Sequence, residues 1–135
     1  MRLIKVFLIF YTVLAAQLLL EEVLQMYRND TLRNHTQAFA LLQNEAASGN
    51  ANAMFLLATA YRSGKAGRVD MQKAYYWYKK AALSGDSDAM LILGWLYYKQ
   101  NGNVKSNTDK ARYWFKEAAM LGVEEAVEML HILGE

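Results

Sequence analysis

Residues 74–89 read AYYWYKKAALSGDSDA, and residues 111–126 read ARYWFKEAAMLGVEEA. A more divergent copy, AFALLQNEAASGNANA, fills residues 38–53, so the three copies follow one another at offsets of 36 and 37 residues. Each copy begins and ends with alanine and keeps a glycine in between, at Gly49, Gly85 and Gly122. A period in this range indicates stacked supersecondary units, each too small to bury its apolar face without its neighbours.

The repeated pattern predicts two helices in each unit. In the first helix, small residues, a leucine and a tyrosine recur at helical spacing: Ala53, Leu57, Ala58 and Tyr61, then Ala89, Leu93, Gly94 and Tyr97. The second helix begins after Asp70 or Asn107, both good N-caps, and ends before Gly85 or Gly122. We therefore expect helix pairs near 51–62 with 70–83 and near 87–99 with 107–120.

The segment 53–89, AMFLLATAYRSGKAGRVDMQKAYYWYKKAALSGDSDA, resembles the Sel1-like repeat, a relative of the tetratricopeptide repeat. It carries A-x3-L-[AG]-x2-Y, a glycine-containing loop and D-x2-KA-x2-W-x3-AA-x2-G-x3-A, and the same spacing returns over 89–126. The resemblance implies an all-α fold, an α-solenoid of antiparallel helix pairs wound into a right-handed superhelix. It also implies a repeat domain over 17–135, with complete repeats at about 50–85 and 86–122 and half repeats at 17–49 and 123–135.

Residues 1–16 form a separate segment. Arg2 and Lys5 precede an uncharged run, VFLIFYTVLAA, whose closing alanines are typical of a secretory signal peptide. The apolar stretch 3–20 is also about long enough for an uncleaved membrane anchor, and a helix buried as a cap on the solenoid is a third alternative. The signal peptide predicts export to the bacterial periplasm or envelope, and the anchor predicts attachment to the inner membrane.

The residues after this segment repeat the first-helix spacing in a degenerate form. Leu19, Val23, Leu24 and Tyr27 stand at the spacings of Ala53, Leu57, Ala58 and Tyr61. We therefore expect 17–28 to be a first helix, with 36–48 as its partner.

The net charge of +2 conceals an asymmetry along the chain. Residues 62–122 contain eleven Lys and Arg against five Asp and Glu, whereas residues 123–135 contain four Glu and no Lys or Arg. The basic surface is either a solvated outer face or a site for an acidic protein partner or an anionic lipid surface. Self-association of the acidic end with the basic body of another copy is a further alternative. Nucleic acid is not an expected partner, because no nucleic-acid motif is present.

The sequence contains no constellation typical of catalysis or metal binding. There is no cysteine, and neither His35 nor His131 has a second histidine at ligand spacing. Neither a phosphate-binding glycine loop nor a nucleophile elbow is present. The sequence therefore predicts a non-enzymatic protein with no catalytic residue, metal site or cofactor. An enzyme that binds or hydrolyses a cell-wall ligand is the alternative that the resemblance leaves open.

A second stripe runs along the first helices, opposite the one that packs between helices. It comprises Asn52, Phe55, Thr59 and Arg62, followed one repeat later by Asp88, Leu91, Trp95 and Tyr98. The resemblance implies that these residues line the concave groove of the stack. Tryptophan and tyrosine are enriched at binding hot spots, although a neighbouring helix that covers these residues as core is an equal alternative. Trp77 and Trp114 recur at a repeat-consensus position and are expected to be core.

The repeats predict a protein–protein interaction module, and the resemblance implies that it is of adaptor, regulator or immunity type. It would bind a protein partner on the concave groove of a short Sel1-like solenoid. A self-assembling structural protein is a further alternative.

Overall fold

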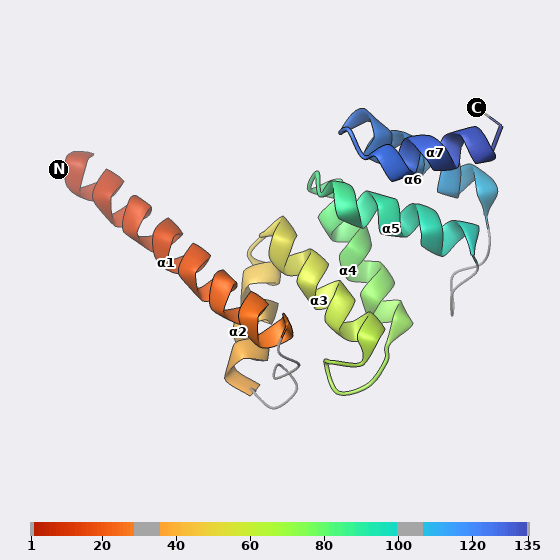
Figure 1. The fold of residues 1–135 in the computed structure, drawn as a ribbon. Coiled ribbons are helices and arrows are strands. Elements are labelled where there is room, and N and C mark those ends of the chain that lie inside the picture. The colour runs from red at the N-terminus through yellow and green to blue at the C-terminus, as the bar shows by residue number, and fades with distance from the viewer. Residues whose placement is uncertain (1, 29–35, 100–106, 135) are drawn as a thin grey trace.

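The computed structural model describes residues 2–28, 36–99 and 107–134, and its regular structure is helical throughout these ranges. The described ranges contain seven helices (Figure 1): α1 (Arg2–Arg28), α2 (Thr36–Ala47), α3 (Ala51–Ser63), α4 (Met71–Leu83), α5 (Ser87–Tyr98), α6 (Thr108–Met120) and α7 (Glu124–Ile132). The all-α prediction is confirmed, and the helix pairs α3/α4 and α5/α6 begin and end within one residue of the predicted bounds.

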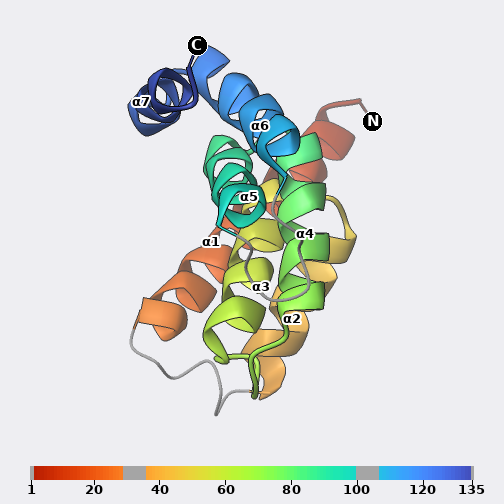
Figure 2. The same ribbon diagram turned by 90° about the vertical axis from the view of Figure 1, so that its right-hand side faces the viewer.

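The helices form two layers. Figure 2 shows α3, α5 and α7 on one side of the stack and α2, α4 and α6 on the other. The main contacts join each helix to the next one along the chain, which is the arrangement of a solenoid. The described core has no buried charged side chain, and its five largest fully buried side chains are Tyr78, Phe115, Leu42, Leu57 and Leu93.

The helix ends follow the predicted local chemistry. The Asp70 carboxylate accepts a hydrogen bond from the Lys73 backbone N–H at 3.0 Å, and the Asn107 side chain accepts one from the Lys110 N–H at 2.9 Å. Each satisfies one of the free donors at a helix N-terminus. After α4 the chain turns at Gly85, whose φ of +94° is a conformation that glycine adopts without steric cost.

Within a repeat, the two helices cross at a small residue of the first helix. Gly94 of α5 faces the ring of Phe115 so closely that an added Cβ would lie 2.5 Å from its Cε1 atom. The equivalent residue in the preceding repeat, Ala58, is fully buried, as are Leu57 and Leu93. These residues confirm the predicted packing stripe of the first helices.

Between repeats, an aromatic residue at the end of each first helix contacts the second helix of the preceding unit. Tyr61 packs edge-to-face on Phe39 with ring centroids 6.0 Å apart, and Tyr97 packs on Tyr75 at 5.7 Å. The Tyr75 and Tyr97 hydroxyl groups also form a hydrogen bond. The sequence period therefore places the same contact at successive interfaces.

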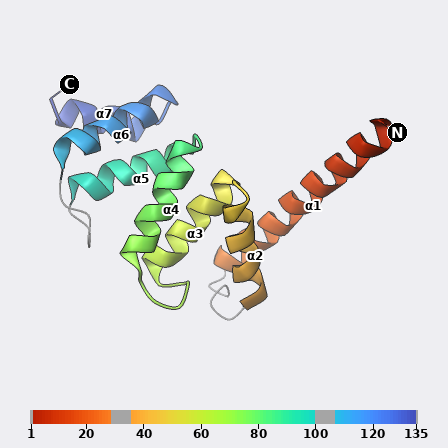
Figure 3. The same ribbon diagram turned by 180° about the vertical axis from the view of Figure 1, so that it is seen from behind.

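The helix α1 consists of two parts with different surroundings. Leu20 and Val23 are buried in the core, where α1 contacts α2. Eleven large apolar side chains between Leu3 and Leu18 are instead 48–76% exposed, and this part projects away from the stack (Figures 1 and 3). The alternative of a helix buried as a cap is therefore wrong for this part. The side chains of Leu19 and Tyr27, which belong to the expected stripe of residues 17–28, lie outside the described residues.

The helix α1 contains a segment with the length and composition of a membrane span. Within the described residues, one helical segment, Arg2–Gln25, qualifies on these two criteria, with a mean hydropathy of 2.2. Its apolar side chains point in all directions around the helix axis, since consecutive residues from Leu3 onward are exposed. A helix that is apolar all round is typical of a membrane span or of a segment buried in the core of a large protein.

Candidate partner-binding face

The eight residues of the second stripe lie on α3 and α5, and we call their surface the first-helix face. On α3, Asn52 and Arg62 are exposed, whereas Phe55 and Thr59 are half-buried. The Phe55 ring packs on Tyr78 of α4 with centroids 5.7 Å apart, and the Thr59 hydroxyl lies 2.9 Å from the Tyr78 hydroxyl. The guanidinium of Arg62 lies 5.9 Å from the centre of the same ring. Tyr78 is thus the buried floor of the α3 half.

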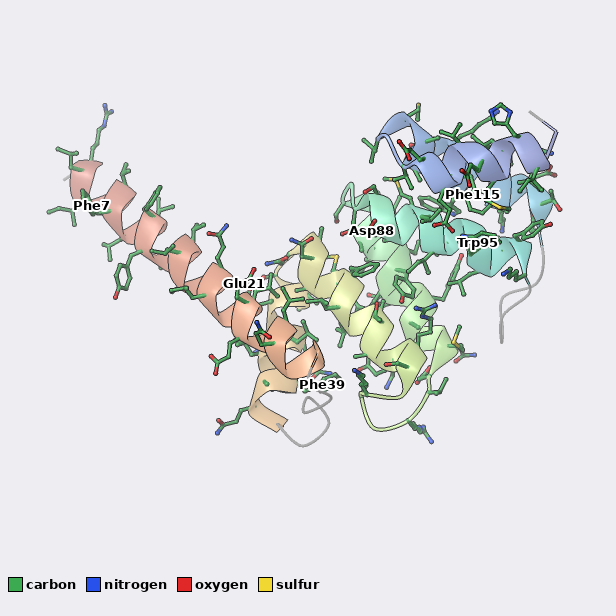
Figure 4. The ribbon with its side chains drawn as sticks, in the orientation of Figure 1. Phe7, Glu21, Phe39, Asp88, Trp95 and Phe115 are labelled. Atoms are coloured by element: carbon green, nitrogen blue, oxygen red, sulfur yellow. The ribbon has the colours of Figure 1, made fainter. Side chains whose placement is uncertain are left out.

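The α5 half is built in the same way with larger side chains. Asp88 and Tyr98 are exposed, whereas Leu91 and Trp95 are half-buried. Trp95 packs edge-to-face on Phe115 with ring centroids 5.7 Å apart, and the two residues lie side by side in Figure 4. The Tyr98 ring also lies near Trp95, with ring centroids 5.9 Å apart. Phe115 therefore occupies the position under Trp95 that Tyr78 occupies under Phe55 one repeat earlier.

The C-terminal helix contributes a contact that the sequence analysis missed. The Trp95 indole N–H donates a hydrogen bond of 2.9 Å to the Glu125 carboxylate of α7, and the Lys99 ammonium lies 4.4 Å from the Trp95 ring. Glu125 stands 37 residues after Asp88, at the same repeat position. That offset is the signal that assigns Glu125 to the first-helix face. Trp95 consequently connects α5 to α7 as well as contributing to the surface.

Charge is distributed unevenly across the first-helix face. Asp88 and Glu125 lie in the first turns of α5 and α7, whereas Arg62 lies in the last turn of α3 and Lys99 follows the end of α5. Each sign of charge is at the helix end where the helix dipole favours it. The face therefore has an acidic side, a basic side and half-buried aromatic and aliphatic residues between them.

The described residues outside this face contribute less to a candidate site. Trp114 is buried, as predicted, whereas Trp77 is only half-buried, and the Lys80 ammonium lies 5.5 Å from its ring. No group of three His, Cys, Asp or Glu in the described ranges is placed to hold a metal ion. His35 lies outside the described residues, and His131 is exposed on α7.

Comparison with protein families identifies three copies of the Sel1 repeat, at residues 23–50, 51–86 and 87–123. Among curated proteins, an ERAD-associated E3 ubiquitin-protein ligase component of Arabidopsis thaliana is 38% identical over 65 residues. That match covers 47% of this chain but 10% of the plant protein.

Solved structures of similar sequence have the same fold. Helicobacter pylori cysteine rich protein B is 31% identical, with a TM-score of 0.72, over 90% of this chain and 91% of that one. A Sel1 repeat protein from Oxalobacter formigenes is 31% identical, with a TM-score of 0.62 and 66% of both chains covered. A protective antigen of uropathogenic Escherichia coli strains, described as displaying an SLR fold, is 35% identical with a TM-score of 0.65. This chain spans only 20% of that antigen, and the match covers 70% of this chain.

Proposed function

Because the chain belongs to the Sel1 repeat family, we propose that it is a non-enzymatic interaction module that holds a protein partner on its first-helix face. Adaptor, regulator and immunity roles are subtypes of this function.

The observation that carries the proposal is the aromatic pair on α5. Trp95 and Tyr98 lie one helical turn apart with ring centroids 5.9 Å apart, and Tyr98 is 37% exposed. The Trp95 ring is held by Phe115 beneath it and by Glu125 beside it. A rigid aromatic anchor of this kind binds a partner at little entropic cost.

The charges around the pair indicate the chemistry of the partner. Lys99 lies on the Trp95 ring, and Arg62 lies on the same side of the neighbouring helix, so the basic side favours an acidic group of the partner. Asp88 and Glu125 on the acidic side disfavour a uniformly acidic partner. A protein segment with an apolar anchor and an acidic group on one side fits this arrangement best.

We further propose that α1 tethers the module to a membrane. Support comes from the exposed apolar surface all round residues 3–18 and from the continuity of α1 into the first repeat. Arg2 and Lys5 at the start of the span favour a cytoplasmic N-terminus, which puts the repeats on the non-cytoplasmic side. A cleaved signal peptide, the alternative, would leave the repeats on that same side without a tether.

Site-specific photo-crosslinking in the producing cell tests the binding face. A photoreactive phenylalanine analogue replaces Tyr98 in one variant and Tyr113, which is 53% exposed on α6, in the matched control. We expect a discrete crosslinked protein from position 98 and none from position 113. Equal crosslinking from both positions would place the interface elsewhere. Crosslinks only to further copies of the chain would support the self-assembling alternative.

Intact mass of the chain, recovered from the membrane and soluble fractions, tests the tether. We expect the uncleaved chain in the membrane fraction. A soluble chain that has lost its N-terminal segment would favour the signal peptide, whereas a soluble uncleaved chain in the cytoplasm would contradict both.

A further inference from the structure

The topology of the stack determines which edge faces the exposed part of α1. The helices α1, α3, α5 and α7 are the first helices of successive units, and α3, α5 and α7 begin at a common edge. The turns at residues 48–50, 84–86 and 121–123 form that edge, and we call it the turn edge. The exposed part of α1 extends from the beginning of a first helix, so it leaves the stack on this side. Figures 1 and 3 show these turns on the side of the free end of α1, and the α3–α4 connection on the opposite edge.

The turn edge carries large apolar side chains that the core does not use. Leu83 at the end of α4 is 69% exposed, and Met120 at the end of α6 is 72% exposed. These two residues stand at the same repeat position, 37 residues apart. Leu121, next in the chain, is 56% exposed. Exposed apolar residues scattered singly need no explanation, but these three lie on the edge from which the apolar helix emerges.

The transition from the exposed part of α1 to the core is abrupt. Leu18 is 65% exposed, whereas Leu20 and Val23 already pack in the core. A membrane span needs about 20 residues for a hydrocarbon core of roughly 30 Å, and the exposed residues 3–18, at about 1.5 Å per residue, cover roughly 24 Å of it. No linker therefore separates the proposed span from the first repeat. The stack begins within about one helical turn, roughly 5 Å, of the hydrocarbon boundary.

We propose that the turn edge rests in the interfacial layer of the bilayer that holds α1, with Leu83, Met120 and Leu121 inserted among the lipids. This inference depends on the membrane tether proposed above. Burial of apolar surface drives the insertion. Attraction to anionic lipids contributes little. The last turn of α4 contributes one basic residue, Lys80, and the last turn of α6 contributes none. The acidic residues that follow the turns, Asp88, Glu124 and Glu125, offset Lys80.

This placement of the turn edge in the bilayer determines the orientation of the module. The first helices point away from the membrane, and the α3–α4 connection, with Arg68 and Val69, becomes the distal edge. The first-helix face then stands upright on the membrane and receives a partner from the side.

The test uses the full chain, which contains no natural cysteine. Four variants, Phe7→Cys, Leu83→Cys, Met120→Cys and Val69→Cys, each carry the same NBD fluorophore. Val69, which is 59% exposed on the distal edge, is the matched control for an apolar exposed position. Each labelled chain is reconstituted in vesicles of phosphatidylcholine and phosphatidylglycerol. Spin labels on the lipids, shallow or deep, then quench fluorophores at the corresponding depth.

We expect the labels at positions 83 and 120 to shift their emission to the blue and to be quenched most by the shallow spin label. The label at position 7 should be quenched most by the deep one, and the label at position 69 by neither. If position 7 is quenched but positions 83 and 120 behave like position 69, the turn edge does not lie in the bilayer, whereas the membrane tether is supported. If position 7 is unquenched, both the membrane tether and the placement of the turn edge in the bilayer are wrong.

Discussion

At the scale of single residues, Gly94 decides how closely α5 and α6 approach. An added Cβ at this position would meet three atoms of the Phe115 ring at 2.5–2.9 Å. An aromatic ring whose position is fixed by a fully buried environment cannot move aside without disturbing its neighbours. The preceding repeat has Ala58 and Tyr78 at the equivalent positions. The two repeats thus use different pairs of residues for the same crossing.

We expect Gly94→Leu to lower the free energy of unfolding by about 1–3 kcal/mol, because the new side chain overpacks the crossing. Urea denaturation followed by circular dichroism measures the change. The control is Ala40→Leu on an exposed position of α2, which should change stability by less than about 0.5 kcal/mol. An unchanged denaturation midpoint for Gly94→Leu would show that this crossing is not tight.

We expect substitution of Tyr98 to affect mainly partner affinity and substitution of Trp95 to affect stability. Tyr98→Ala removes the exposed member of the pair and should weaken partner binding by about 2 kcal/mol, roughly thirtyfold, with little loss of stability. Tyr113→Ala on the opposite layer should leave affinity unchanged. Isothermal titration calorimetry with the partner identified by crosslinking measures the affinity of both variants. A Tyr98→Ala variant that binds like the wild type would remove this residue from the interface.

The Trp95 contact with α7 makes a separate prediction about stability. Trp95→Phe keeps a ring on Phe115 but removes the N–H that donates to Glu125. We expect the free energy of unfolding to fall by about 0.5–1.5 kcal/mol. Relative to the wild type, amide hydrogen exchange should accelerate more in α7 than in α5. Exchange that rises equally in all helices would indicate global destabilisation and contradict a specific contact.

At the scale of helices, the N-cap of α5 is a source of pH-dependent stability. The Asp86 carboxylate accepts a hydrogen bond from the Ala89 N–H at 2.8 Å. Desolvation by burial raises the pKa of Asp86 above its ordinary value of 3.8, because the charged form loses contact with water. The folded state therefore binds this proton more tightly than the unfolded state. The resulting stabilisation is complete below the unfolded pKa and is lost as the pH rises through the folded one.

We expect Asp86→Asn to raise stability near neutral pH, because asparagine caps a helix equally well without a desolvated charge. The gain should shrink towards zero as the pH falls below the ordinary aspartate value of about 4. Urea denaturation from pH 7 to pH 3.5 measures it. Asp86→Ala, which loses the cap acceptor, is the control and should be less stable than Asp86→Asn by about 1 kcal/mol. A gain that is independent of pH would contradict this cause.

The helices and their contacts differ in how well the sequence predicts them. The helix pairs were predictable because caps such as Asp70 and Asn107 and the small-residue stripe act locally. The contact of Trp95 with Glu125 was not, because it joins residues 30 positions apart and depends on how α7 stacks. The burial of Phe55 likewise follows from Tyr78 beneath it, which only packing reveals. Composition changes at Glu21, yet α1 continues through it to Arg28.

At the scale of the whole molecule, the chain combines a repeat stack with a rigid apolar extension. The two share one helix, so the extension cannot rotate independently of the first repeat. Membrane attachment and presentation of the first-helix face are therefore coupled in the proposed tethered form.

We expect Ile9→Arg, a charge in the middle of the exposed part of α1, to reduce the share of chain that remains in carbonate-washed membranes. An arginine at the centre of a span costs about 2.5–3.5 kcal/mol. Val69→Arg, at a position 59% exposed on the distal edge, should leave this share unchanged. Equal membrane retention of wild type and Ile9→Arg would show that α1 does not cross the bilayer.

The contacts between successive helices also bear on how such a chain can evolve. Each helix packs mainly on its neighbours in the sequence, and the interface of Tyr75 with Tyr97 has the same form as that of Phe39 with Tyr61. A tandem duplication of residues 86–122 would therefore insert a unit whose two interfaces already have matching partners. Lineages can lengthen the protein by unequal recombination, gaining surface for a new partner without redesigning the existing core.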